Sequence, residues 1–476
     1  MTQRLLRWFP FVLLATGVAV VASRASRGAS DNDLWWHLRL GYDFLEQGSL
    51  ATPAHWSSLA TQSWLSTEPL PEVIIAKADQ WGGLDAVMWL YGVALMALVV
   101  ALYAGNRVVS RPLPASLTAL VALLGCATSL TPRPQLGSFV LLALVLRAWN
   151  RTSDDLQPRW YLIPLCYGWS LWHGFWFIGV AYGFLEIAGL LLDRRVRMAQ
   201  AWPLLTVATL SGASVLLNPL GLGLFSAPFE RQPARVAISE WGHTTPTTPG
   251  SITVLVMVLL VAGLLLTDRR LRSWRALLLF VTAVFWAWYA WRTLALASIV
   301  LSPLLARGLD AMLERSAPPG RESTETEVAP RTEVRVLTAW LAFCAIVLAA
   351  LLPTTAREPS RTSAVDQALD TLPPGSVVLN YYDVGGWLAW RHPDLNRAID
   401  GTVRPYDPSY IARYRDAMDV QPGWQAFIHD IDARAALLLD SSDIERALQK
   451  ANWSVTARVD DYVLLLPPGA ATAGAG

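Results

Sequence analysis

Eleven apolar segments along the chain have the length, or nearly the length, of a membrane-spanning helix. They lie near residues 8–23, 84–104, 112–130, 135–149, 160–172, 175–192, 202–218, 251–267, 276–291, 293–311 and 336–353. A helix needs about 20 apolar residues to cross the hydrocarbon core of a bilayer. The pattern therefore predicts an α-helical polytopic membrane protein with about eleven transmembrane helices. Residues 8–23 also end in small residues, as a signal peptide does, but Arg4 and Arg7 favour a retained first span.

Some of these segments follow each other with almost no polar gap, around residues 130–137, 172–175 and 291–293. Hydropathy alone would merge them, so the distribution of arginines decides. If the N-terminus is cytoplasmic and the pairs are split, every short inner connection is basic, through Arg107, Arg111, Arg151, Arg159, Arg194, Arg195, Arg197, Arg269, Arg270, Arg272 and Arg275. Cytoplasmic loops are enriched in Lys and Arg. We therefore expect separate spans, a cytoplasmic N-terminus and an extracytoplasmic tail.

The pattern changes after the last predicted span. Short stretches with alternating strand and helix signals follow, at residues 376–380, 388–390, 397–400, 435–440, 441–449 and 462–467. They predict a small extracytoplasmic α/β domain over residues 356–470. The other predicted divisions are a transmembrane core at 1–311 with a first outer loop at 24–83, a charged cytoplasmic linker at 312–335 and a last transmembrane helix at 336–353.

Composition agrees with a membrane protein. Of the 476 residues, 53% are hydrophobic and 16% are charged, so a soluble multidomain protein would leave too much apolar surface unexplained. The net charge of +1 gives no indication of a nucleic-acid partner. The three cysteines, Cys126, Cys166 and Cys344, lie in apolar runs without metal-ligand spacing, and we expect no disulfide and no thiol chemistry.

Ionisable residues gather on the predicted outer side of the membrane. They are Asp31, Asp33, His37, Glu68, Glu72, Arg133, His173, Glu240 and Arg292. Ionisable groups near a bilayer are candidates for function because they are costly there. A carboxylate such as that of Asp33 can deprotonate a hydroxyl or hold a divalent metal, and arginines can neutralise a phosphate. We therefore predict one outer cavity suited to an enzyme that takes a sugar from a lipid phosphate.

Each of these residues also has an ordinary structural explanation. An acidic pair at the end of a span can cap a helix, and Trp35 and Trp36 fit an interfacial aromatic belt. Glu68 and Glu72 are four residues apart, as on one helical face, but the prolines between them predict a helix that begins near Pro71. That start weakens the argument for a shared face. The recurrence of such residues at non-adjacent spans is the stronger observation.

The run DNDLWWHLRLG at residues 31–41 resembles the signature DPDLWWHLRTG of a group of bacterial multi-span proteins similar to GT-C glycosyltransferases. Further matches are spread over the chain, at Trp64, Glu68 and Glu72 (WxxxExxxE), 133–135 (RPQ), 173–174 (HG), 218–221 (NPxG) and 240–241 (EW). In the tail, residues 380–388 and 399–406, which include Arg404, resemble NxYDWGGYL and IDGRxDxY. The chain departs from the group at Asn32, Leu171 and Thr402, where Pro, Asn and Arg are frequent.

The resemblance implies a GT-C-like enzyme of the bacterial plasma (inner) membrane, with a polyprenyl-phosphate-linked sugar as donor and an unknown extracytoplasmic acceptor. By position, Asp33, supported by Asp31, would be the general base of an inverting transfer or would coordinate a divalent metal, Mg or Mn. Arg133 or Arg292 would bind the donor phosphate. The other candidates for substrate binding are His37, Glu68, Glu72, His173, Glu240 and Asp400.

Two other functions use the same residues. A transporter or flippase for a lipid-linked or anionic solute would use the outer cavity without covalent chemistry, but it predicts matching polar groups on the inner side or an inverted repeat. A non-catalytic factor for envelope assembly would instead depend on its tail. In the tail, Gly385 and Gly386 and the pair Asp400 and Gly401 would admit close approach of backbone or ligand, but we favour ordinary turns of a packed α/β domain.

Overall fold

The structure is a computed structural model. It describes residues 7–26, 31–50, 56–62, 65–226, 240, 242–316, 330–355, 364–402 and 405–469. The chain divides into two compact units. The helical unit comprises Met1–Arg27, Asp85–Pro228 and Ile238–Ala356. The α/β unit comprises Gly28–Leu84, Phe229–Ala237 and Arg357–Gly476.

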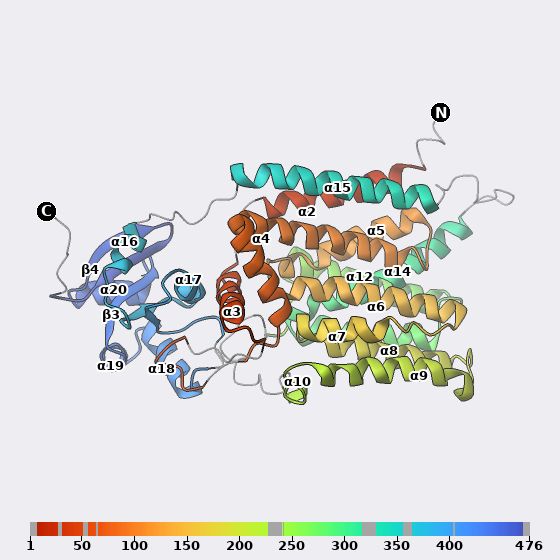
Figure 1. Cartoon of the computed structure of the whole chain (residues 1–476). Helices are drawn as coiled ribbons and strands as arrows, with labels where there is room; N and C mark the ends of the chain where they lie inside the picture. The colour runs from red at the N-terminus through yellow and green to blue at the C-terminus, as the bar shows by residue number, and fades with distance from the viewer. Residues whose placement is uncertain are drawn as a thin grey trace. The chain divides into compact units, whose positions relative to one another are not determined.

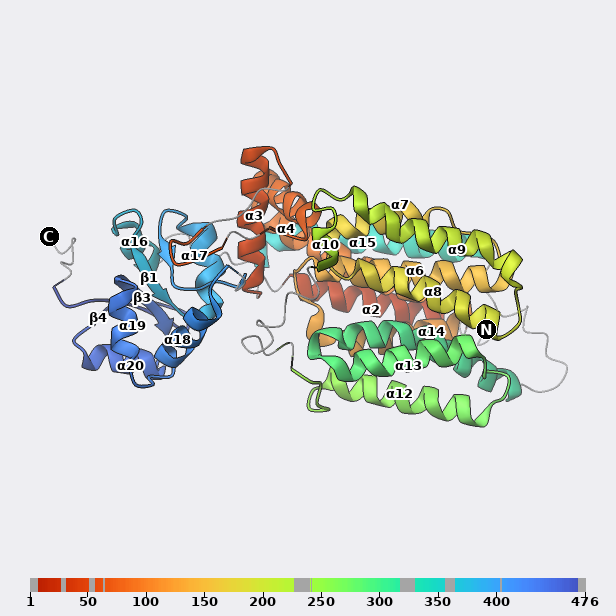
Figure 2. The ribbon, with the colours of Figure 1, turned by 90° about the horizontal axis from the view of Figure 1, so that it is seen from below.

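Every apolar segment predicted as a span coincides with a helix. In the helical unit these are α2 (Phe9–Ala25), α5 (Pro112–Gly125), α6 (Gln135–Asp155), α7 (Leu162–Trp172), α8 (Trp176–Leu192), α9 (Met198–Ala213), α12 (Pro249–Thr267), α13 (Trp274–Tyr289), α14 (Leu294–Arg315) and α15 (Pro330–Thr355), and α4 (Pro69–Asn106) enters from the α/β unit. Short helices η1 (Ala127–Ser129), η2 (Ser214–Leu217), α10 (Gly223–Ser226) and η4 (Trp291–Thr293) connect them. The long helices run roughly side by side (Figures 1 and 2).

Helices long and apolar enough to cross a bilayer are present. Among the described residues they number five, namely Pro69–Asn106, Met198–Leu217, Pro249–Thr267, Trp291–Arg315 and Arg331–Pro353. Four shorter apolar helices, α2, α5, α8 and α13, accompany them. The chain is therefore a multi-pass membrane protein. The count of eleven crossings and the orientation stay predictions.

The segments with little polar gap are separate helices, as predicted. His173, between α7 and α8, has extended backbone angles of φ −169° and ψ 150°. Ala290, between α13 and η4, is likewise extended, with φ −162° and ψ 156°. An extended residue breaks the helical hydrogen-bond ladder, so each pair consists of two helices and not one long span.

Helix α14 forms the centre of the helical unit. Its residues Leu294–Val300 are almost completely buried, and it packs against α5, α12 and α13. Polar side chains join it to its neighbours: the Nδ2 of Asn106 donates to Ser302 Oγ at 2.8 Å, and Ser298 Oγ donates to the carbonyl of Ala122 at 2.9 Å. Such interhelical hydrogen bonds stabilise helix packing where lipid supplies no hydrophobic driving force.

The tail contains a five-stranded sheet with the order β2-β1-β3-β5-β4. Its strands are β1 (Val377–Asn380), β2 (Asn396–Arg397), β3 (Ala433–Leu439), β4 (Ser454–Val459) and β5 (Tyr462–Leu466). Strands β1, β2 and β3 are parallel, whereas β5 is antiparallel to both β3 and β4. The predicted α/β character of the tail is confirmed.

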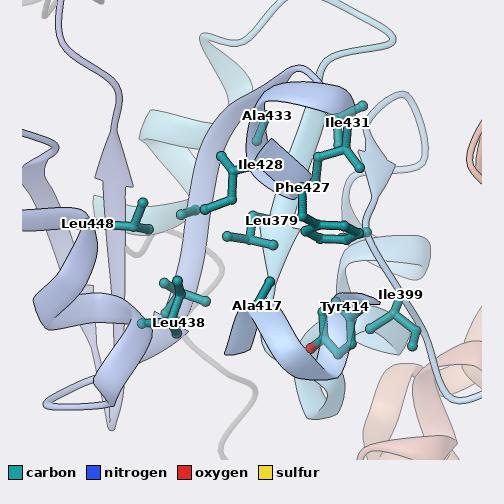
Figure 3. Close-up of a cluster of buried hydrophobic side chains, with 14 of the residues drawn as sticks. Leu379, Ile399, Tyr414, Ala417, Phe427, Ile428, Ile431, Ala433, Leu438 and Leu448 are labelled. Atoms are coloured by element: carbon teal, nitrogen blue, oxygen red, sulfur yellow. The ribbon is translucent and has the colours of Figure 1, made fainter. Parts of the chain in front are cut away.

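Helices cover both faces of this sheet, and alternate strand residues point to opposite faces. Leu379 and Leu438 face a core completed by α18 (Pro408–Met418), α19 (Trp424–Asp430) and α20 (Asp443–Lys450), as Figure 3 shows. Val378 and Leu437 face a second core with α16 (Ala364–Asp370) and α17 (Gly385–Arg391). Strand β4 and helices α16, α18 and α19 have no counterpart in the sequence prediction.

The predicted first outer loop contains regular structure. Helix α3 (Asp33–Gln47) begins inside the DNDLWWHLRLG run and packs against α17. Helix α4 begins at Pro69, two residues before the predicted start near Pro71, and proline is well tolerated in a first helical turn. A break at Gly82 and Gly83 divides α4; Gly83 has φ 64° and ψ −164°, a conformation that a residue with a side chain rarely adopts. The two units divide just after this break.

Candidate functional site

Two acidic residues stand at the start of α3. Asn32 is the N-cap and Asp33 is the first helical residue. The Oδ1 of Asp31, a buried side chain, accepts a hydrogen bond from the amide of Asp33 at 2.9 Å. The N-terminal end of a helix favours negative charge because its amides point outward. Both carboxylates therefore lie at the N-terminal end of α3.

The glycines of the two tail motifs contact this helix start. A Cβ on Gly401 would lie 2.9 Å from Asp33 Oδ1 and 2.7 Å from Trp36 Nε1. A Cβ on Gly386 would lie 2.9 Å from the carbonyl oxygen of Asn32. Real Cβ atoms do not approach other atoms so closely, so a side chain at position 386 would clash with the backbone of Asn32, and one at position 401 would displace the side chains of Asp33 and Trp36. The first-loop motif and the tail motifs thus form one packed region of the α/β unit.

Further contacts attach the rest of the first loop to the tail. The Oγ of Ser57 donates to the carbonyl of Arg397 at 2.8 Å, and the amide of Thr61 donates to the carbonyl of Pro405 at 2.9 Å. The rings of Trp35 and Trp390 lie 4.9 Å apart between centroids. These contacts join residues more than 300 positions apart in sequence.

Asp400 fixes the turn that carries Gly401. Its Oδ2 accepts from Arg397 Nε and from the Tyr406 hydroxyl, both at 3.1 Å. Its Oδ1 accepts from the amide of Thr402 at 3.0 Å and from the Thr402 hydroxyl. Burial, with the neighbouring Asp400 carboxylate, holds the pKa of Tyr406 well above its ordinary value, so this hydroxyl stays a donor. Substrate binding by Asp400 stays a prediction.

One turn further along α3, His37 lies between two carboxylates. Its Nδ1 is 2.9 Å from Glu72 Oε1, and its Nε2 is 3.9 Å from Glu68 Oε2. All three residues are buried, and one ligand atom from each lies within 4.8 Å of the others. An imidazole nitrogen with two carboxylates is a donor set that suits a divalent transition metal, and it also suits a protonated histidine.

The helical unit contains a second group of the predicted residues. Arg133 Nη1 donates to both carboxylate oxygens of Glu240, at 3.0 and 3.2 Å, and Arg292 Nη1 lies 4.0 Å from Glu240 Oε2. They line a cavity of about 330 Å³, together with Thr128, Ser129, Thr131, Gln135, Thr247, Thr248 and Trp291. We call this the Glu240 cavity. Two arginines against one carboxylate leave a net positive charge beside several hydroxyls, which suits an anion.

His173 does not line the Glu240 cavity. It is buried, and its Nδ1 accepts from the amide of Phe175 at 3.1 Å. The neighbouring Trp172 Nε1 donates to the carbonyl of Pro134 at 2.9 Å. The residues around His173 therefore join the HG and RPQ segments, and a role of His173 in shaping the site stays a prediction.

The predicted site residues fall into both units. Asp31, Asp33, His37, Glu68, Glu72 and Asp400 belong to the α/β unit, whereas Arg133, His173, Glu240 and Arg292 belong to the helical unit. Trp64, Trp241 and Arg404 lie outside the described residues. Sequence reasoning missed the hydroxyls of Thr247 and Thr248, although the pattern Thr248-Pro-Gly-Ser251 is that of a capping box and marks the start of α12.

No protein-family model and no curated protein matches the sequence. Solved structures do match. The oligosaccharyltransferase AglB of Archaeoglobus fulgidus, in complex with an inhibitory peptide and dolichol-phosphate, has a TM-score of 0.55 and 12% identity over 91% of this chain and 69% of that one. ArnT of Cupriavidus metallidurans, bound to undecaprenyl phosphate, has a TM-score of 0.53 and 14% identity over 97% of this chain and 98% of that one.

Another structure of the Archaeoglobus enzyme, a complex with zinc and sulfate, has a TM-score of 0.51 and 11% identity, and the match covers 90% of this chain and 68% of that one. AglB and ArnT are GT-C membrane glycosyltransferases. This protein therefore has the GT-C fold, and the predicted fold class is confirmed at that level.

Proposed function

We propose that this protein is a membrane glycosyltransferase that moves a sugar from a polyprenyl-phosphate donor to an acceptor on the extracytoplasmic side. The observation that carries the proposal is the GT-C fold, shared along nearly the whole chain with ArnT, whose structure holds undecaprenyl phosphate. Within the α/β unit, the acidic start of α3 offers a carboxylate that suits a base, and within the helical unit the Glu240 cavity offers cations that suit a phosphate.

Asp33 is the proposed general base. In an inverting transfer, a hydroxyl oxygen of the acceptor attacks the anomeric carbon of the sugar while the bond from that carbon to the phosphate oxygen breaks. The polyprenyl phosphate leaves with the bonding electron pair, and the Asp33 carboxylate takes the hydroxyl proton. Asp31 acts as a positioning residue, since its carboxylate accepts a hydrogen bond from the Asp33 amide at the start of α3.

Arg133 and Arg292 are the proposed phosphate-binding residues. Charge on the phosphate grows as it leaves, so arginines aimed at it stabilise the transition state more than the ground state. Glu240 sets the position of the Arg133 guanidinium through two hydrogen bonds before donor arrives. The hydroxyls of Thr131, Thr247 and Thr248 line the same cavity and are further donors to phosphate oxygens.

A divalent metal is compatible with the α/β unit. His37, Glu68 and Glu72 have the donor set that fits such an ion, whereas coordination by Asp31 or Asp33 stays a prediction. Such an ion would supply positive charge to a donor phosphate. Asp33 and His37 are four residues apart on α3 and share a face of that helix, so the base and this cluster are neighbours.

The test is sugar transfer by purified full-length protein, with a panel of synthetic undecaprenyl-phosphate sugars and envelope extract as acceptor. Asp33→Asn should lower transfer at least a hundredfold, within the range for loss of a general base. Glu46→Gln, an exposed carboxylate on the same helix, is the matched control and should leave transfer unchanged. Full transfer by folded Asp33→Asn would refute the role of Asp33, and the absence of transfer with every donor would refute the proposed function.

A further inference from the structure

A larger cavity, of about 720 Å³, lies where α4 and α6 end and α15 begins. These three helix ends lie on the same side of the helical unit (Figure 1). The connections at all three positions are predicted to be cytoplasmic. Its lining includes the apolar residues Val100, Leu337 and Leu341 and four arginines, Arg107, Arg147, Arg151 and Arg159. We call this the Arg147 cavity.

Two of the four arginines are bound to carboxylates. Arg107 Nε lies 3.2 Å from Glu333 Oε1, which also accepts from the Tyr103 hydroxyl at 2.6 Å. Arg159 Nη2 lies 2.5 Å from the Oδ2 of Asp155, the last residue of α6, four residues earlier in the chain. Glu333 and Asp155 therefore neutralise Arg107 and Arg159, and these two arginines have little charge left for a ligand.

Arg147 and Arg151 are different. In the part of the chain that the structure describes, neither has a carboxylate oxygen within 4.0 Å. Arg147 Nε donates to the carbonyl of Ala104 at 3.2 Å, a bond that orients the guanidinium without neutralising it. Asp154 is the remaining carboxylate of the lining, so it offers one negative charge against two positive ones.

The positions of these two arginines favour an anion between them. They are four residues apart on α6, so they lie on one face of the helix one turn apart. Like charges at this spacing destabilise a helix. An anion between the two guanidinium groups would reverse the sign of that interaction, and phosphate matches the planar fork of arginine through paired hydrogen bonds.

We propose that the Arg147 cavity binds an anionic phospholipid of the cytoplasmic leaflet, with its phosphate between Arg147 and Arg151. The acyl chains would lie along Val100, Leu337 and Leu341, whereas a free phosphate would gain nothing from contact with these apolar side chains. Anionic lipids are concentrated in that leaflet, and each nearby arginine strengthens their binding. This site is separate from the proposed sugar transfer, whose residues lie elsewhere, so the two proposals fail independently.

The test is native mass spectrometry of the full-length protein in detergent, titrated with phosphatidylglycerol and, separately, with phosphatidylcholine. The wild type should retain phosphatidylglycerol in preference. Arg147→Gln/Arg151→Gln should bind it about thirtyfold more weakly. The matched control, Arg111→Gln/Arg315→Gln, removes the same charge from arginines that are paired with Asp310 and Asp268 outside the cavity, and it should bind as the wild type does.

A second variant guards against loss of folding. Leu337→Trp enlarges an apolar side chain of the lining and leaves both arginines in place, so it should also lower phosphatidylglycerol binding while the melting temperature shows a folded protein. Inorganic phosphate, added as a competitor, should not displace the lipid. Equal binding by the double variant and its matched control would overturn the proposal, and so would displacement by millimolar phosphate.

Discussion

The two cavities of the helical unit lie at opposite ends of α6. Gln135, the first residue of this helix, lines the Glu240 cavity, and Arg147 and Arg151, near its end, line the other. A helix of 21 residues is about 30 Å long, the thickness of a bilayer core. Two arginines share one carboxylate at the first end, whereas two at the second have none within 4.0 Å among the described residues.

This difference separates two ways of preparing a binding site for an anion. A carboxylate that already holds an arginine fixes its geometry but competes with the ligand, which suits a phosphate that must arrive and leave. An arginine pair without a carboxylate has no such competitor, so we expect it to release its anion more slowly. Substitution of single arginines distinguishes the two cases, and a third, fully paired arginine serves as the reference.

The reference is Arg275, which is buried between α8 and α13. Its guanidinium donates to both carboxylate oxygens of Glu186 and to Asn150 Oδ1. Arg275→Met would leave a buried carboxylate unpaired, so we expect a loss of about 3–5 kcal/mol in the free energy of unfolding. Thermal unfolding in detergent measures the effect, with the exposed Arg272→Met as control. If Arg275→Met has the same melting temperature as the wild type, the ion pair contributes nothing to stability.

Arg133→Gln should act on catalysis instead of stability. Arg133 is partly exposed at the cavity, so its loss leaves no buried charge, but it removes a donor to the leaving phosphate. We expect transfer to fall about 100- to 1000-fold with a nearly unchanged melting temperature. A melting temperature lowered as far as that of Arg275→Met would show that Arg133 is structural, and the contrast between the two arginines would be lost.

Glu240→Gln should have a smaller effect than Arg133→Gln, and it should strengthen the binding of undecaprenyl phosphate. The glutamine keeps a hydrogen-bond acceptor for Arg133 but removes the negative charge that repels a phosphate. Undecaprenyl phosphate should therefore bind about fivefold more tightly, a gain near 1 kcal/mol. Titration followed by native mass spectrometry gives the two affinities. Weaker binding by Glu240→Gln would mean that orienting Arg133 matters more than the competing charge.

The smallest effect is expected for Arg159→Gln. This arginine lines the Arg147 cavity but is paired with Asp155, four residues earlier in the chain. Surface pairs at this spacing contribute about 0.5 kcal/mol or less. The melting temperature and phosphatidylglycerol binding should both stay close to those of the wild type. A loss of lipid equal to that of Arg147→Gln/Arg151→Gln would show that the pairing of an arginine does not decide which one binds.

Hydrophobic patterning predicted the helices well because each helix makes its backbone hydrogen bonds within its own segment. The position of a helix therefore depends mainly on local sequence. The arginine distribution correctly separated α7 from α8 and α13 from α14. The parallel strands β1 and β3 were also predicted, since both are short apolar runs. Helix α3 was missed because its motif was read as a loop, and β4 because its exposed residues weaken the apolar pattern.

The candidate site was predictable as a list of residues but not as a set of contacts. Nothing in the sequence near Gly386 or Gly401 indicates that Asn32 and Asp33 lie against them. Such contacts join segments far apart in the chain, and their contribution to the free energy of folding depends on how the whole unit folds. The grouping of His37 with Glu68 and Glu72 joins α3 to the start of α4, and no local pattern in the sequence indicates that these two segments pack together.

The α/β unit has a consequence for how the protein is made. Its first segment, with α3 and the beginning of α4, leaves the ribosome before nearly all of the membrane helices, and the sheet it packs against is synthesised last. At ordinary rates of translation the early segment waits tens of seconds for its partner. During that interval Trp35, Trp36 and the His37 cluster lack the tail that covers α3, so a chaperone or the membrane surface has a window in which to hold them.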